Sequence, residues 1–370
     1  MGDLKIRYGG VVAGDEEITA AAEVMRGPGW ACGQVTRDLE TALAAYMGLP
    51  HAVFLNSGTS GLLAALRCLP PGSGVVMPAL QFPTLYSAAV WCGLRPVLAD
   101  ISLDTLNMTG ESLEKALAGT DADVQAVAFV HVAGNPAGIS DVAAVCRERG
   151  LILVEDCCDA LGSTSGGRKA GTFGDISVIS THAAHHVTTG EGGAAFTTRD
   201  DFATRMRRLR DWGRDIDGSG SYDFLECGLN LRTSDILAAI GLVQLRRLDD
   251  FISARRGNHA ALARELAGAA RFPEARPGDD PSWYTFPLLT PHRDEVAAEL
   301  AAYGIETRHL LCGNLARQPL AGGTLNPADY PNADEAWRDG LWLPVHPRHS
   351  TEDMTRAGAI AREILIGGGA

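Results

Sequence analysis

Lysine is scarce in this chain of 370 residues, because only Lys5, Lys115 and Lys169 supply it among 32 basic residues. Few side chains are therefore able to form an imine with a carbonyl cofactor. Positive charge is also in deficit, since the formal net charge is −13. Nucleic acids and anionic membranes attract clustered lysine and arginine, so this balance argues against both as partners.

Paired cysteine motifs and long apolar runs are missing as well. The eight cysteines show no C-x-x-C or C-x-C spacing, so the ligand patterns of zinc and iron–sulfur sites are absent. We interpret them as free thiols in a reducing compartment, and we expect no bound metal. The sequence has no charged and apolar leader and no apolar segment long enough to span a bilayer, which predicts a cytoplasmic protein.

Short apolar segments alternate with amphipathic ones along the first two thirds of the chain. We expect strands at 52–55, 74–80, 96–100, 124–131, 151–156 and 175–181, and helices at 15–26, 36–46, 86–92 and 140–149. This alternation predicts an α/β fold whose mainly parallel sheet has helices on both faces. From about Leu242 a long helix at 243–266 leads into shorter strands. The change predicts a large domain with an N-terminal arm at 1–242 and a small α+β domain at 243–370.

The segment NSGTSG at 56–61 joins an expected strand to an expected helix. Its small residues allow a ligand to approach the backbone, and the amides at a helix N-terminus attract anions. Thr59 and Ser60 add hydroxyl donors. No Gly-Lys-Ser/Thr follows, so the segment is not a P-loop. It is either a phosphate-binding turn or simply a turn.

Glu155 and Asp156 end the apolar segment at 151–156. The carboxyl ends of parallel strands are where sheets of this kind bind ligands. A carboxylate at that edge could pair with a protonated ring nitrogen and keep a pyridinium charged. The alternative is that Asp156 only caps a helix.

Three histidines, His182, His185 and His186, fall within five positions and precede the run Gly-Glu-Gly-Gly at 190–193. Neither strand nor helix periodicity explains this cluster. Metal binding is one interpretation, but no carboxylate lies at a ligand spacing within the cluster.

Together these segments resemble the sugar aminotransferase and dehydratase family known as the DegT–StrS group, from about residue 8 to 365. The resemblance implies the aspartate-aminotransferase fold and a pyridoxal phosphate or pyridoxamine phosphate cofactor. The family pattern near the histidines is roughly S-F-H-x-x-K-x-x-x-x-G-E-G-G. Counting back from Gly190, His185 occupies the position of the family's Schiff-base lysine.

The resemblance also implies which residues hold the phosphate of the cofactor. These are Gly58, Thr59, Ser60 and Ser180.

Further positions are implied around the cofactor ring. Phe82 falls where an aromatic residue stacks on the ring, Asp156 would pair with the pyridine nitrogen, and Asp159 lies nearby. Asn230 would reach the phosphate bound by a neighbouring subunit. The resemblance therefore implies a homodimer with shared active sites.

A histidine in place of the lysine marks one branch of the family, the 3-dehydratases of nucleotide-linked 4-keto-6-deoxyhexoses. GLRPVLADISLDTLNM (93–108), HVAGNPAGISDV (131–142) and RHLLCGNLARQP (308–319) also resemble this branch. Its iron–sulfur members carry a cysteine cluster just after a segment like RDWGRD (210–215), but here the next cysteine is Cys227. We therefore expect no iron–sulfur cluster, as in enzymes similar to GDP-4-keto-6-deoxymannose 3-dehydratase.

The implied activity is that of a lyase. Pyridoxamine phosphate would condense with the C4 ketone of the nucleotide sugar, His185 would act as the base, and the C3 hydroxyl would leave. An imidazole suits this role, because its ordinary pKa of about 6.5 lies near working pH. An amino donor such as glutamate would recharge the cofactor. Three alternatives stay open: an aminotransferase, a dehydratase of a non-sugar ketone in secondary metabolism, and an inactive homologue that binds or regulates.

Overall fold

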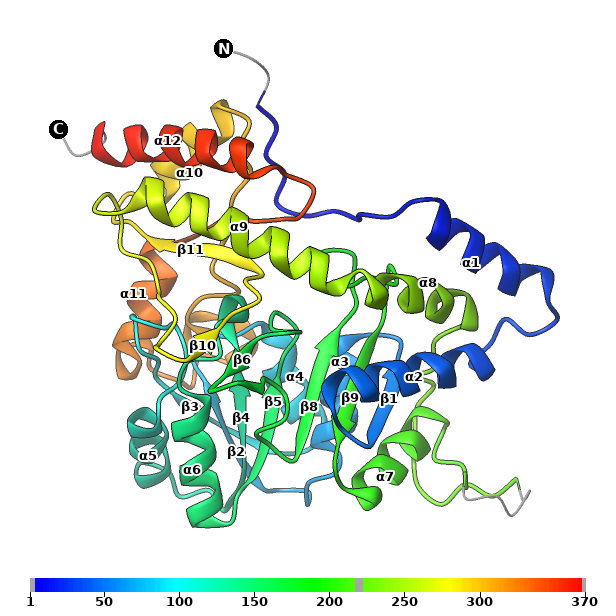
Figure 1. The fold of residues 1–370 in the computed structure, drawn as a ribbon. Helices are drawn as coiled ribbons and strands as arrows, with labels where there is room; N and C mark the ends of the chain where they lie inside the picture. Colours follow the sequence, from blue (N-terminus) through cyan, green and yellow to red (C-terminus); the bar gives the residue numbers. More distant parts are fainter. Residues whose placement is uncertain (1–3, 217–221, 368–370) are drawn as a thin grey trace.

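The computed structural model describes residues 4–216 and 222–367, and a seven-stranded sheet forms its centre (Figure 1). In spatial order its strands are β1 (His51–Leu55), β9 (Gly193–Thr197), β8 (Ile176–Ser180), β5 (Ile152–Asp156), β4 (Val124–Val130), β2 (Gly74–Pro78) and β3 (Arg95–Ala99). The run from β8 to β3 is parallel, whereas β9 is antiparallel to both of its neighbours. The predicted α/β class with a mainly parallel sheet is confirmed.

Helices cover both faces of this sheet, because successive strand residues point to opposite sides and both sides are apolar. Val53 and Leu55 join one core, while Ala52 and Phe54 join a core on the other face. The first face is covered by α3 (Gly58–Leu66), α4 (Pro83–Trp91) and α7 (Asp200–Arg210). The second is covered by α2 (Gln34–Met47), α5 (Gly110–Ala118), α6 (Ile139–Arg149) and α8 (Asp235–Arg246).

A smaller antiparallel sheet lies toward the C-terminus of the chain (Figure 1). It contains β11 (Thr285–Leu289), β13 (Gly340–Pro344) and β12 (Arg308–His309). Around it lie α9 (Leu248–Leu266), α10 (Arg293–Ala302), α11 (Pro331–Asp339) and α12 (Thr351–Gly367). One apolar core unites residues from 261 onward with Ile6, which forms a bridge to Ile305. The N-terminal segment is thereby attached to this smaller unit.

Two helical features complete the frame. Helix α1 (Asp15–Arg26) packs against α8. The single helix expected at 243–266 is instead divided between α8 and α9. The N–H of Arg247 donates to Gln244 only three residues back, which tightens the backbone and ends α8 before α9 begins. Among the described residues, no helix combines the length and apolarity needed to cross a membrane.

Candidate active site

A cavity of about 590 Å³ lies at the carboxyl ends of β4, β5 and β8. It brings together seven of the nine residues expected from the sequence, which are Gly58, Thr59, Phe82, Asp156, Asp159, Ser180 and His185. Ser60 and Asn230 do not line it. The Ser60 hydroxyl donates instead to Oδ1 of Asn56 at 2.6 Å, and Asn230 is exposed on the surface of the chain.

The N-terminus of α3 forms one end of the cavity. The Oγ of Ser57 caps this helix by accepting from the N–H of Ser60 at 3.0 Å. Two glycines bring α3 close to the sheet, because a Cβ on Gly193 would lie 2.5 Å from the nitrogen of Gly58. Ser180 stands beside Gly58 on β8. Helix amides, hydroxyls and a close glycine contact fit a phosphate group.

A buried carboxylate forms the floor. Asp156 ends β5, is 8% exposed, and accepts from the N–H of Cys158 at 3.1 Å. Burial raises the pKa of Asp156. No cation pairs with it among the described residues, so a protonated ring nitrogen would complement its charge. Phe82, which precedes α4 and is 56% exposed, offers an aromatic face to the same cavity. These residues fit a pyridoxamine or pyridoxal phosphate.

His185 lies in the turn that follows β8. Its ring stacks on Tyr284, with centroids 5.1 Å apart and planes at 24°. Its Nδ1 is 3.6 Å from Oδ1 of Asp159. Burial lowers the pKa of His185 to about 3, and the nearby His182 and Arg255 add to the effect. The pKa of His185 thus lies below the ordinary value of about 6.5, because its surroundings in the cavity wall disfavour the charged ring, although 17% of the side chain is exposed.

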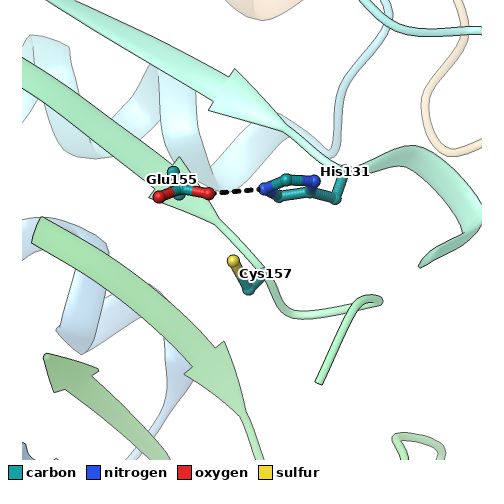
Figure 2. Close-up of side chains that lie close together, drawn as sticks. All are labelled: His131, Glu155 and Cys157. Atoms are coloured by element: carbon teal, nitrogen blue, oxygen red, sulfur yellow. Dashed lines mark hydrogen bonds and ion pairs between the residues drawn. The ribbon is translucent and has the colours of Figure 1, made fainter. Parts of the chain in front are cut away.

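A second buried group consists of His131, Glu155 and Cys157, which lie close together (Figure 2). Of these three residues, His131 lines the cavity. Oε2 of Glu155 lies 2.9 Å from Nε2 of His131 and accepts from Gly171 N–H, while Oε1 accepts from Gly174 N–H. Burial raises the pKa of the Cys157 thiol well above its usual value, so the thiol keeps its proton. Both oxygens of Glu155 thus serve hydrogen bonds that join β4, β5 and the turn at 171–174. The sequence predicts that His131 is a core or dimer-interface residue. It is buried, and it also lines the cavity.

Four further lining residues come from distant parts of the chain: Tyr8, Tyr284, Arg308 and Trp342. Tyr8 stacks on Trp342, and the Arg308 guanidinium lies over the Tyr8 ring, 5.2 Å from its centroid. No local motif indicates Tyr8, Tyr284 or Trp342, since their proximity depends on the N-terminal segment reaching the smaller sheet. Arg308 begins the segment 308–319, which indicates a site only through its resemblance to the dehydratases.

Residues 12–361 match the model of the DegT/DnrJ/EryC1/StrS aminotransferase family. The chain belongs to this family. A dTDP-4-dehydro-2,6-dideoxy-D-glucose 3-dehydratase from Saccharopolyspora spinosa is 35% identical over 388 residues, covering 94% of this chain and 83% of that protein. A dTDP-4-dehydro-2,3,6-trideoxy-D-glucose 4-aminotransferase from the same organism is 33% identical over 357 residues, covering 91% and 90%.

Solved structures agree with this assignment. A GDP-4-keto-6-deoxymannose-3-dehydratase with a trapped PLP–glutamate geminal diamine has a TM-score of 0.88 and 25% identity, covering 96% of this chain and 100% of that chain. The aminotransferase fold expected from the sequence is confirmed. Because the relatives include both dehydratases and aminotransferases, membership in the family establishes a sugar-modifying enzyme class without choosing between the two reactions.

Because the family pattern has a Schiff-base lysine, the positions of the three lysines in this chain bear on how a cofactor could be held. All three lie in the described part of the chain, and none lines the cavity. The Lys169 ammonium contacts the carbonyl of Tyr46 and lies over its ring, 4.0 Å from the centroid. The segment after 210–215, where iron–sulfur members carry cysteines, falls partly at 217–221, outside the described residues.

Proposed function

We propose that this chain is a pyridoxamine/pyridoxal phosphate-dependent dehydratase that removes the C3 hydroxyl of a nucleotide-linked 4-keto-6-deoxyhexose. The observation that carries the proposal is an imidazole at the position of the family lysine, facing a cavity that no lysine lines. Without an ε-amine the cofactor is held by non-covalent contacts and works in its amine form.

When bound, the cofactor supplies an amine that condenses with the C4 ketone and a ring that accepts an electron pair. The residues of the chain do the rest. Asp156 keeps the ring nitrogen protonated, the N-terminus of α3 and Ser180 hold the phosphate, and Phe82 covers one face of the ring. His185 takes the proton from the methylene carbon and returns a proton to the departing C3 hydroxyl. The C3 oxygen would leave as water, and hydrolysis at C4 would then free the nitrogen as ammonia and give a 3-deoxy-4-keto sugar.

The proposed working unit is a homodimer in which Asn230 of one protomer reaches the phosphate bound by its partner. Asn230 is exposed and lies in a stretch with large exposed apolar side chains, where Phe224, Leu225 and Leu229 are each more than half exposed. Exposed apolar side chains close together in sequence favour a protein interface. Burying them against a second copy would bring Asn230 to the edge of the neighbouring cavity.

A transamination is the second candidate, and the 4-aminotransferase that is 33% identical to this chain favours it. Histidine could carry the proton between carbon atoms in that reaction too. The two reactions differ in their products, since transamination leaves nitrogen on the sugar whereas dehydration releases ammonia and loses the C3 oxygen.

The decisive experiment incubates the purified protein with pyridoxamine phosphate, glutamate and GDP- or dTDP-linked 4-keto-6-deoxyhexoses. Mass spectrometry of the sugar and an ammonia assay then identify the product. We expect loss of the C3 oxygen together with ammonia release. If the sugar product retains nitrogen, the enzyme is an aminotransferase and the proposed dehydratase activity is wrong. Cofactor binding without turnover of any of these sugars would contradict both.

The substitution His185→Lys tests the role of the imidazole directly. With added pyridoxal phosphate, the new lysine should form a covalent bond that borohydride reduction traps and peptide mapping assigns to position 185. Dehydration should fall by about 10²-fold or more, the typical contribution of a positioned base. His51→Lys, at a surface position that pairs with Asp200, is the matched control and should leave dehydration unchanged. Dehydration by His185→Lys at the wild-type rate would remove His185 from the mechanism.

A further inference from the structure

The turn after β5 places two carboxylates in the cavity with different neighbours. Asp156 ends the strand and Asp159 follows in a tight turn closed by the N–H of Ala160 donating to the carbonyl of Cys157 at 2.9 Å. Both aspartates are 8% exposed. Asp159 faces Nδ1 of His185 at 3.6 Å. The sequence placed Asp159 only near the cofactor ring, whereas the structure places it against the candidate base.

The imidazole of His185 is held from its other sides by buried groups. Tyr284 stacks on the ring, and Arg255 donates to the carbonyl of Tyr284 at 2.8 Å and to that of Ala184 at 3.4 Å. Arg255 is 1% exposed. The plane and backbone of His185 are therefore fixed, and Asp159 is the carboxylate that faces Nδ1.

Nδ1 of His185 is buried and makes no hydrogen bond in the described structure, since 3.6 Å is just beyond bonding distance. A small approach would close this contact, as contacts between catalytic groups often tighten only when ligands bind. A carboxylate that accepts from Nδ1–H fixes the tautomer of a histidine, leaves the Nε2 lone pair free, and stabilises the imidazolium that forms when Nε2 takes a proton.

We propose that Asp159 is a positioning residue that accepts a hydrogen bond from Nδ1 of His185 and so presents Nε2 of the imidazole as the base. This inference rests on the proposed role of His185. Burial raises the pKa of Asp159 to about 8, so Asp159 acts as this acceptor in its ionised form, and the negative charge would then favour proton uptake by the partly exposed imidazole. Besides Asp159, the charged or titratable groups that act on or contact His185 are His182, His186, Arg255 and Tyr284, and the backbone of Cys158 also lies within reach of the ring.

The first test reads the tautomer without any turnover. Nitrogen NMR of histidine-labelled protein, with and without pyridoxamine phosphate, reports which ring nitrogen carries the proton, and the His185→Gln spectrum assigns the signals. We expect protonated Nδ1 in the wild type and its loss in Asp159→Leu, which removes the acceptor at similar volume. A wild-type ring protonated at Nε2 would overturn the proposal, whatever sugar the enzyme uses.

The second test separates kcat, KM and cofactor affinity. Asp159→Asn should lower kcat by roughly 10- to 100-fold, the range found for groups that orient metal-ligating histidines, while KM and the affinity for pyridoxamine phosphate change little. Asp121→Asn, at an exposed aspartate paired with Arg95, is the matched control. A loss that saturating cofactor fully restores would make Asp159 a cofactor ligand only and reject the positioning role. Wild-type protein with the expected tautomer but no dehydration would instead reject the proposed function.

Discussion

At the scale of single residues, Asp159 lines the cavity and destabilises the folded chain when it is ionised. Burial raises its pKa from 3.8 to about 8, with Asp156 adding to the effect. The folded state therefore keeps a proton that the unfolded chain has already lost above about pH 4. The stability that Asp159 contributes is fully present below its unfolded pKa, and it is lost as the pH rises through the folded value.

It follows that Asp159→Asn should be more stable than the wild type without cofactor, and the gain should grow as the pH rises. Urea unfolding at about pH 5 and about pH 8 checks this, with a limiting slope for one group of about 1.4 kcal/mol per pH unit. Asp121→Asn, at a side chain that is 90% exposed, is the matched control for the substitution itself. Parallel stability curves for Asp159→Asn and wild type would mean that Asp159 is ionised in the folded state throughout. If Asp159 is kept for activity at a cost in stability, Asp159→Asn should be both more stable and less active than the wild type.

The sequence was sufficient to predict the candidate site residues that lie at or just after the ends of strands. His185, Asp156 and Ser180 follow or end β8 and β5, so a correct strand prediction also predicts their common edge. Ser60 was expected at the phosphate, but its hydroxyl is engaged by Asn56, a local bond that the pattern of small residues does not reveal. Tyr284 and Arg255 were out of reach, because their contacts with the 184–185 turn join segments about 70 or more residues apart.

At the scale of elements, the expected strands of the parallel run appear close to their predicted bounds, because each is a compact apolar segment. Strand β9 was not expected, since Gly193–Thr197 is short and follows the glycine-rich run directly. Its antiparallel position between β1 and β8 is determined by long-range packing and not by the local sequence. It nevertheless matters for the site, because its first residue supports the N-terminus of α3.

Replacing that residue should disturb the phosphate end of the cavity. A Cβ in Gly193→Ala would lie 2.5 Å from the nitrogen of Gly58 and 2.6 Å from the carbonyl carbon of Ser57. These are backbone atoms, so α3 must move away from β9. We expect affinity for pyridoxamine phosphate to fall by about tenfold or more, equivalent to about 1.4 kcal/mol, as measured by calorimetric titration. Gly367→Ala, where a Cβ meets nothing within 4 Å, should bind normally. Unchanged affinity in Gly193→Ala would show that α3 does not hold the phosphate.

At the scale of the whole molecule, the cavity is lined by residues of the central sheet, of the sheet that contains β12 and β13, and of the N-terminal segment, whereas Asn230 does not line it. A second copy is the partner that would bring such a residue to a site of this chain, because two-fold symmetry makes each protomer both donor and acceptor. No sequence pattern gives the geometry of that contact. The resemblance supplied Asn230, and exposed apolar side chains near it support the placement.

Purified heterodimers test whether active sites are shared. One heterodimer combines a protomer carrying His185→Asn with a protomer carrying Asn230→Asp. As homodimers, both variants should be inactive, the second because its new carboxylate would lie against the phosphate. If Asn230 acts across the interface, one site contains both defects and the other contains none, so the heterodimer should recover about half of the wild-type activity. If Asn230 acts within its own protomer, both sites are defective and the heterodimer is inactive. The reciprocal heterodimer, wild type with the double variant, reverses these outcomes: shared sites predict no activity, whereas separate sites predict about half. Two-tag purification and a dehydration assay on both species decide between the arrangements.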